Sequence, residues 1–156
     1  KGWEIGICAK ELKTTGKQEL LEEFYSGPCS GILNLEFLTP TAFKSNGRYQ
    51  IFPDMRYIYQ SLMNKYSAAS AEMEMYDGET LEQLVAHSSV VRYRLHSTFF
   101  PLEGVKIPSF KGEITVKVGG TQTMARYARL LARFGEYAGL GIKTAMGMGG
   151  LKLERV

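Results

Sequence analysis

The strongest constraint on the fold of this chain is the change in spacing of its hydrophobic residues from residue 31 onward. Residues 33–37 alternate between apolar and polar side chains, which predicts a half-buried strand that stops at Thr39-Pro40. Apolar residues then recur at helical spacing, at Met55, Ile58, Tyr59, Leu62, Met63 and Tyr66. This pattern predicts an amphipathic helix that begins at Pro53, where the missing N–H of proline costs nothing.

The second half of the chain continues to alternate between strand and helix. Residues 79–86, which follow the Asp77-Gly78 turn, predict a short helix. The later elements are a strand over residues 90–100, a turn near Glu103-Gly104, a strand over residues 113–118 broken by Gly119-Gly120, a helix from about Thr121 to Tyr137, and a short strand from Leu151 to Glu154. The order is strand, helix, strand, strand, helix, strand, which predicts an α+β, ferredoxin-like (βαββαβ) domain with an antiparallel sheet.

Two of these elements also show which side chains share a face. In the strand over residues 90–100 one face is apolar and the other is basic. The apolar face holds Val91, Tyr93, Leu95 and Phe99, and the basic face holds Arg92, Arg94 and His96. The helix that follows Thr121 turns Met124, Tyr127, Ala128, Leu131 and Phe134 inward.

The segment before residue 29 lies outside this order of elements. Residues 3–9 alternate between apolar and polar side chains and predict a strand without a partner in its own segment. Residues 18–25 predict a short helix that is ended by Ser26-Gly27-Pro28.

Composition excludes several classes of protein. No stretch approaches the roughly 18 apolar residues of a membrane span, and the N-terminus has no signal pattern. We therefore expect a cytoplasmic protein without a membrane partner. Cys8 and Cys29 lack the spacing of metal ligands, and His87 and His96 are the only histidines that could join them. We expect no metal site and interpret both cysteines as buried apolar residues.

Charge is distributed unevenly along the chain. Residues 1–103 carry 10 Lys and Arg against 13 Asp and Glu, a net charge of −3, whereas residues 104–156 carry 9 against 3, a net charge of +6. This asymmetry indicates a face that binds a polyanion. A surface of solvated, scattered lysines is the alternative that composition leaves open.

Three arginines form a stripe on the helix that follows Thr121. Arg126, Arg129 and Arg133 are spaced at i, i+3 and i+7, so they lie opposite its apolar face. Glu136 is the only carboxylate nearby at helical spacing, and the planar guanidinium group fits phosphate well. The stripe indicates a phosphate-binding face, with an ordinary solvated helix face as the alternative.

A glycine-rich stretch follows this helix, with five glycines among the twelve residues from Gly139 to Gly150. Such a backbone can approach a ligand closely and present bare N–H groups, with Lys143 and Thr144 as further phosphate ligands. A P-loop is excluded because Ile142, rather than glycine, precedes the lysine. Both the P-loop and the dinucleotide fingerprint also require strand, loop and helix in that order, whereas here the order is helix, loop, strand.

Three segments of the chain match one known family. They are Gly139-Leu140-Gly141-Ile142-Lys143-Thr144 with Gly147-Met148-Gly149, then Leu38-Thr39-Pro40-Thr41-Ala42-Phe43-Lys44 with Phe52-Pro53-Asp54, and finally Phe110-Lys111-Gly112. In these segments the chain resembles the CRISPR repeat-processing endoribonucleases of the repeat-associated protein superfamily, in the C-terminal signature, the junction of first strand and helix, and the strand before the last helix. The resemblance covers roughly residues 18–156.

This resemblance implies a two-domain parent protein with two ferredoxin-like halves. Residues 1–28 would be the terminal strand and linker helix of a mostly missing N-terminal domain, and residues 29–156 the C-terminal RNA-binding domain with the glycine-rich loop. Such proteins bind the CRISPR repeat RNA of the precursor transcript and cut it once per repeat without metal or cofactor, by attack of a ribose 2′-hydroxyl on the adjacent phosphate. Other CRISPR-associated proteins and a second copy of the chain are further candidate partners.

The resemblance also bears on the site residues. In much of the family a histidine of the first half is the general acid or base, and neither His87 nor His96 matches its position, so we expect the catalytic residues upstream. The RNA-binding candidates are Arg126, Arg129, Arg133, Gly139, Gly141, Lys143, Thr144, Gly147, Gly149, Lys44, Arg92, Arg94 and His96. Bases could also stack on Phe43, Tyr49 or Phe52, although Phe43 and Phe52 could equally belong to the core.

Three hypotheses of function follow. The first is an endoribonuclease that processes CRISPR RNA, with this chain supplying mainly RNA binding. The second is a non-catalytic RNA-binding structural subunit of a CRISPR interference complex. The third is a ferredoxin-like interaction domain that binds no nucleic acid, and a lack of salt-dependent RNA affinity would identify it.

Overall fold

The structure, a computed structural model, describes residues 6–26, 29–70 and 77–154. Its centre is a four-stranded sheet in which every neighbouring pair is antiparallel. The strands lie in the order β4 (Ser88–Leu102), β5 (Val105–Val118), β1 (Ile32–Thr41) and β6 (Leu151–Glu154). Together with the two helices that follow β1 and β5, this is the ferredoxin-like arrangement, so the prediction of the fold class is confirmed.

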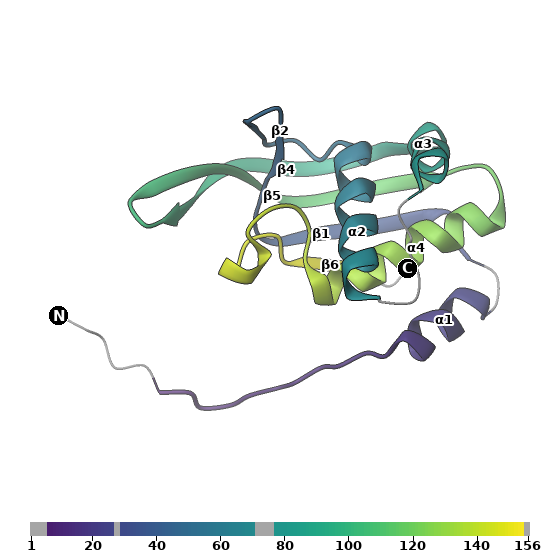
Figure 1. Ribbon diagram of the computed structural model, residues 1–156, viewed down its shortest axis with the longest axis horizontal. Coiled ribbons are helices and arrows are strands. Elements are labelled where there is room, and N and C mark those ends of the chain that lie inside the picture. The colour runs from purple at the N-terminus through teal and green to yellow at the C-terminus, as the bar shows by residue number, and fades with distance from the viewer. Residues whose placement is uncertain (1–5, 27–28, 71–76, 155–156) are drawn as a thin grey trace.

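Two helices pack across one face of this sheet (Figure 1), namely α2 (Met55–Ala69) and α4 (Gln122–Ala138). All six apolar residues predicted to face inward from α2 are buried. The helix begins later than expected, because the Asp54 carboxylate accepts a hydrogen bond from the N–H of Arg56 and so caps it. Pro53 therefore precedes the cap and is not the first helical residue.

The core lies between these helices and the sheet. β1 contributes Leu33, Leu35 and Phe37, β5 contributes Ile114, Val116 and Val118, and α4 contributes Ala125, Ala128, Leu131 and Ala132. Of the residues predicted to face inward from α4, Ala128 and Leu131 are buried, whereas Met124, Tyr127 and Phe134 are only half-buried. The expected stop of β1 at Thr39-Pro40 is wrong, because the strand continues to Thr41 through an irregularity in its pairing with β5.

The long strand β4 differs from the expectation of one apolar and one basic face. A bulge between Val90 and Arg92 places Val90, opposite Val116, on the core side, and leaves Val91 55% exposed. Tyr93 and Phe99 are also exposed, because β4 is an edge strand that reaches beyond the helices. The prediction that Val91 lies on one apolar face with Tyr93 and Phe99 is therefore wrong. The side chains of Tyr93 and Phe99 are not buried.

The remaining elements surround this framework. They are α1 (Lys17–Tyr25), the hairpin of β2 (Phe43–Ser45) and β3 (Arg48–Gln50), α3 (Gly78–His87), and the 3-10 turn η1 (Thr144–Met146). The short helices predicted over residues 18–25 and 79–86 are confirmed. Of the strand predicted over residues 3–9, residues 3–5 lie outside the described part, and residues 6–9 form no strand. Among the described residues, none of the helices combines the length and the apolar character that a membrane span requires.

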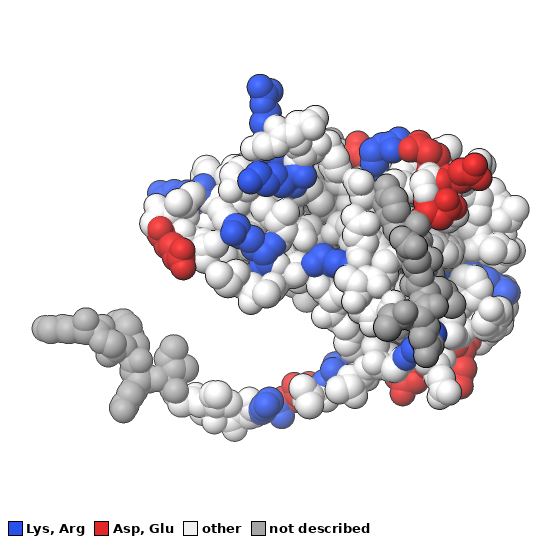
Figure 2. Space-filling view, in the orientation of Figure 1, with Lys and Arg blue, Asp and Glu red and all other residues white. Residues whose placement is uncertain are grey.

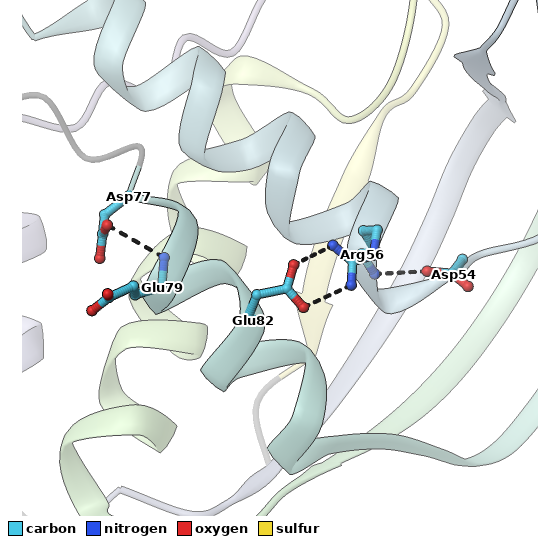
Figure 3. A network of polar contacts seen from close by, with 5 residues as sticks. All are labelled: Asp54, Arg56, Asp77, Glu79 and Glu82. Carbon is cyan, nitrogen blue, oxygen red and sulfur yellow. Dashed lines mark hydrogen bonds and ion pairs between the residues drawn. The ribbon is translucent and has the colours of Figure 1, made fainter.

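Polar contacts join α3 to the start of α2 (Figure 3). The Asp77 carboxylate caps α3 by accepting hydrogen bonds from the N–H groups of Glu79 and Thr80, and it also accepts one from the Thr80 hydroxyl. The hydroxyl bond first, and then the N–H bonds, lower the pKa of Asp77. Both guanidinium nitrogens of Arg56 donate to Glu82, at 2.5 and 2.8 Å. Because this pair is exposed, we expect it to orient the two helices more than to stabilise them.

A second Arg–Glu pair, on α4, is more buried and makes a testable contribution to stability. Glu136 accepts a hydrogen bond from Arg133 at 2.6 Å and one from the N–H of Leu153 at 3.0 Å, so it joins α4 to β6. The Glu136→Ala variant should lose about 2–4 kcal/mol of unfolding free energy, because it leaves a buried N–H and a half-buried guanidinium without this acceptor. Urea unfolding measures this loss, and the exposed pair gives the control, since Glu82→Ala should change stability less. Equal losses in the two variants would contradict the assigned role of Glu136.

Candidate nucleic-acid interface

The glycine-rich loop (residues 139–150) joins α4 to β6 and is the yellow-green segment in front of β1 in Figure 1. Four of its glycines have left-handed backbone angles, with φ of 71° at Gly139, 77° at Gly141, 94° at Gly147 and 71° at Gly149. Lys143 adopts the same region, with φ of 52°, although side chains are rarely tolerated there. The loop is therefore a specific folded structure whose shape depends on its glycines.

Most of the N–H groups in this loop bond within the protein. Ile142 donates to the carbonyl of Ala42, Gly149 donates to that of Pro40, and Gly150 donates to the Thr39 hydroxyl. The N–H groups with protein acceptors are those of Gly139, Leu140, Gly141, Ile142, Met146, Gly147, Met148, Gly149 and Gly150. The expectation that the glycines present bare N–H groups to a ligand is therefore wrong for most of the loop. They instead let it pack tightly against the end of β1.

The side chains at the tip of the loop are better placed to bind an anion. Lys143 is exposed, and the neighbouring Thr144 hydroxyl accepts a hydrogen bond from the Lys65 ammonium group at 2.8 Å. Lys65 lies on α2 and is half-buried, and this burial lowers its pKa. Among the described residues no carboxylate lies within ion-pairing distance of Lys65 or Lys143. A positive charge that is partly desolvated and not neutralised favours an anionic ligand.

Lys65 is the residue that the sequence did not reveal. It occupies an ordinary position on an amphipathic helix, 79 residues from its partner Thr144. Only the packing of the loop against α2 brings these two residues together. Nothing in the local pattern of α2 could have indicated the contact.

The β2–β3 hairpin extends the same basic region. It is attached to the loop because Ala42, directly before β2, accepts the N–H of Ile142. Its Lys44 ammonium group lies 5.8 Å from the centre of the Tyr49 ring, and Arg48 is exposed. Figure 2 shows Lys and Arg side chains over the part of the molecule that holds this hairpin and the loop, whereas Asp and Glu gather mainly over α3.

A separate group of candidates lies on the sheet face that α2 and α4 do not cover. Arg92 pairs with Thr115, Arg94 with Glu113 and His96 with Lys111, and these positions of β5 alternate with the buried ones. Arg94 lies 3.8 Å from Glu113 and its side chain is 85% exposed, so this ion pair is weak. Arg92, Arg94 and His96 therefore share one surface, as predicted, but not the surface of the glycine-rich loop.

The arginine stripe of α4 is not open to solvent in the way the sequence suggested. Arg126, Arg129 and Arg133 are all half-buried, and Arg133 bonds to Glu136. Leu130, which lies between Arg126 and Arg133 on the helix surface, is only 5% exposed because α1 packs against α4. RNA contacts from this stripe stay a prediction, and the structure assigns Arg133 a role in the protein itself.

The histidines have ordinary environments. The Nδ1 atom of His87 lies 2.8 Å from the carbonyl of Gln83, one turn earlier in α3. A ring N–H at this position satisfies a carbonyl near the end of the helix. Among the described residues no group of three or more His, Cys, Asp or Glu side chains could hold a metal ion.

Comparisons of sequence and comparisons of structure both match this chain to the same family of known proteins. The family model described as CRISPR-associated endoribonuclease Cas6 matches residues 35–151, which include most of β1, the hairpin, both large helices and the glycine-rich loop. The CRISPR-associated endoribonuclease Cas6 of Streptococcus thermophilus is 44% identical over 151 residues, which cover 97% of this chain and 62% of that protein.

Solved structures of similar proteins share the fold. The Cas6 structure from Thermus thermophilus superposes with a TM-score of 0.75 at 27% identity, covering 90% of this chain and 58% of the other. A structure described as a Cas6 product complex has a TM-score of 0.75 at 26% identity, covering 87% and 56%. The chain thus spans between about half and about three-fifths of the length of the curated relatives it matches.

Proposed function

Because this chain belongs to the family of CRISPR-associated endoribonucleases named Cas6, we propose that it acts in CRISPR RNA processing by binding the repeat RNA of the precursor transcript. The observation that carries this proposal is the placement of Lys143, Thr144 and Lys65 at the tip of the glycine-rich loop. The Lys65 ammonium group bonded to the Thr144 hydroxyl, with the exposed Lys143 next to Thr144 in the chain and no carboxylate among the described residues ion-paired to either lysine, suits a phosphate of the RNA backbone. Such contacts fix the position of the RNA and leave the reading of its sequence to other groups.

The proposed reaction is metal-independent cleavage, in which a ribose 2′-hydroxyl attacks the adjacent phosphorus and the 5′-oxygen leaves. This reaction needs a base to accept the hydroxyl proton and an acid to protonate the leaving oxygen. The His87 ring is bonded to the Gln83 carbonyl, and His96 lies on the far face of the sheet from the loop. We therefore assign this chain mainly to RNA binding and place the proton-transfer groups in another part of the whole protein.

This assignment gives the two regions of the chain different roles. Residues 29–156 act as a ferredoxin-like RNA-binding domain, and residues 1–28 act as the connection to a further ferredoxin-like domain. Arg92, Arg94 and His96, on the uncovered face of the sheet, form a second surface for RNA. The first surface for RNA consists of the glycine-rich loop, Lys44 and Lys65.

The test is a titration of the 156-residue chain into labelled CRISPR repeat RNA and into a scrambled RNA, in EDTA, with the products resolved on a gel. Salt-dependent binding without cleavage is the expected result. Cleavage at a single site would show that the acid and base lie in this chain, and His87 and His96 would then be substituted first. Absence of binding to either RNA at low salt would refute the proposed function.

The similar proteins are described as endoribonucleases, which does not favour the alternative of a structural RNA-binding subunit, and the same gel separates the two candidates. The two candidates share the binding result, so the whole protein must be assayed beside the chain. Cleavage by the whole protein in EDTA supports the endoribonuclease. Binding without cleavage by the whole protein supports the structural subunit.

A further inference from the structure

Two exposed aromatic side chains at the edge of the sheet have no role in the core. Phe52, which lies between β3 and α2, is 58% exposed, and Tyr93 of β4 is 65% exposed. Their ring centres are 6.4 Å apart, and the rings meet edge to face at 80°. The edge-to-face contact holds the two rings in fixed positions while leaving much of each ring in solvent.

A hairpin with basic and aromatic side chains lies just before Phe52 in the chain. Tyr49 and Lys44, whose ring and ammonium group are in contact across the β2–β3 hairpin, lie shortly before Phe52 along the chain. Phe52 is the third residue after Tyr49, so their Cα atoms are at most about 11 Å apart. The hairpin is joined in turn to the glycine-rich loop by the bond between Ala42 and Ile142. Cationic and aromatic groups therefore follow one another from the loop through the hairpin to Tyr93.

We propose that Phe52 and Tyr93 form a stacking site for an unpaired base of the RNA whose phosphates lie at the hairpin and the glycine-rich loop. This inference rests on the proposed function and adds a subsite to it. Single-stranded RNA is typically bound by aromatic side chains that stack on splayed bases, beside cations that hold the backbone. Edge-to-face rings cannot both be parallel to one base, so one ring stacks on the base and the other borders its edge.

The chemistry of the pair predicts two separable contributions to binding. Stacking involves neutral groups, so it raises affinity without changing the slope of log K against log salt. Phosphate contacts release counterions and therefore set that slope. An RNA without bases should keep the phosphate contribution and lose the stacking contribution.

The experiment uses the full 156-residue chain with two short probes of equal length, a single-stranded oligoadenylate that carries 2-aminopurine and an abasic ribose-phosphate strand. The Phe52→Leu/Tyr93→Leu variant should bind the oligoadenylate about tenfold more weakly, with an unchanged salt slope, and bind the abasic strand as the unsubstituted chain does. Quenching of 2-aminopurine fluorescence should decrease in parallel. Tyr93→Phe should keep the affinity, because it keeps the ring.

The matched control is Tyr25→Leu, which should keep the affinity for both probes, since Tyr25 is 71% exposed and belongs to α1, a helix that lies away from the β2–β3 hairpin in Figure 1. Unchanged affinity of the Phe52→Leu/Tyr93→Leu variant for oligoadenylate would overturn the stacking site while leaving the proposed function intact. An equal loss of affinity for both probes would overturn it too, since the variant would then have disturbed the backbone contacts. Failure of the unsubstituted chain to bind either probe would overturn the stacking site, whereas the proposed function is tested separately by its titration into repeat RNA.

Discussion

The Gly149→Ala variant should lose about 3 kcal/mol or more of unfolding free energy, because of a backbone clash and a left-handed conformation. A Cβ atom at Gly149 would lie 1.9 Å from the carbonyl oxygen of Leu140, and φ there is 71°. The obstacle is backbone that bonds across the loop, since Leu140 donates to the carbonyl of Gly149. No side-chain rotation can relieve the clash, so the loop must shift. Urea unfolding followed by circular dichroism measures the loss.

The control for this variant is Gly147→Ala in the same loop. Gly147 also has a positive φ, of 94°, but nothing lies within 4 Å of the position that its Cβ would take. It should therefore lose only about 1–2 kcal/mol, the cost of the left-handed backbone. Equal losses at the two positions would show that close approach of the backbone is not what requires glycine at Gly149.

The Lys65→Met/Lys143→Ala variant should bind single-stranded RNA at least about a hundredfold more weakly, because two ammonium–phosphate contacts of about 1.5 kcal/mol or more each contribute about 3 kcal/mol or more together. The slope of log K against log salt should fall by about 0.7 for each phosphate that the variant no longer neutralises, which fluorescence anisotropy at several salt concentrations measures. Methionine keeps the apolar stem of Lys65 packed against its neighbours, so stability should change little.

The matched control for this variant is Lys10→Ala/Lys13→Ala, which removes the same net charge from exposed residues of the N-terminal segment. Its affinity should change far less, since neither lysine belongs to the loop, to α2 or to the β2–β3 hairpin. If both double variants bound RNA equally weakly, RNA binding would depend on net charge and not on a site at the loop. Substitution of Arg129 and Arg133 is a poorer test, because half-buried side chains beside α1 affect stability as well.

The sequence was sufficient for the fold because the core residues of β1, β5 and α2 follow regular periods. It was insufficient where long-range pairing changes a local pattern. The bulge that turns Val91 outward depends on the register between β4 and β5, and the exposure of Tyr93 depends on β4 being an edge strand. No window of residues within β4 contains that information.

In the candidate site, too, residues in a local pattern could be predicted and residues brought together by long-range packing could not. Lys143 and Thr144 could be predicted because glycine-rich loops are visible in a sequence. Lys65 could not be predicted, because its partner Thr144 is distant along the chain. The half-burial of the arginine stripe could not be predicted either, because the packing of α1 on α4 is not visible in the sequence of α4. The number of glycines in the loop suggests a close approach of a ligand. At Gly141 and Gly149, however, the group that approaches closely is a carbonyl of the protein's own backbone.

The attachment of the glycine-rich loop to the end of β1 has a consequence for the order of folding. The N–H of Gly150 reaches the hydroxyl of Thr39 across 111 residues of chain, and β6 pairs with β1 over a similar separation. Contacts of such high sequence separation form late, because a long loop must close before they stabilise anything. The phosphate-binding shape therefore arises only when the sheet is complete. A partly folded chain lacks this shape, so under the proposed function we expect affinity for RNA to arise only at the final step of folding.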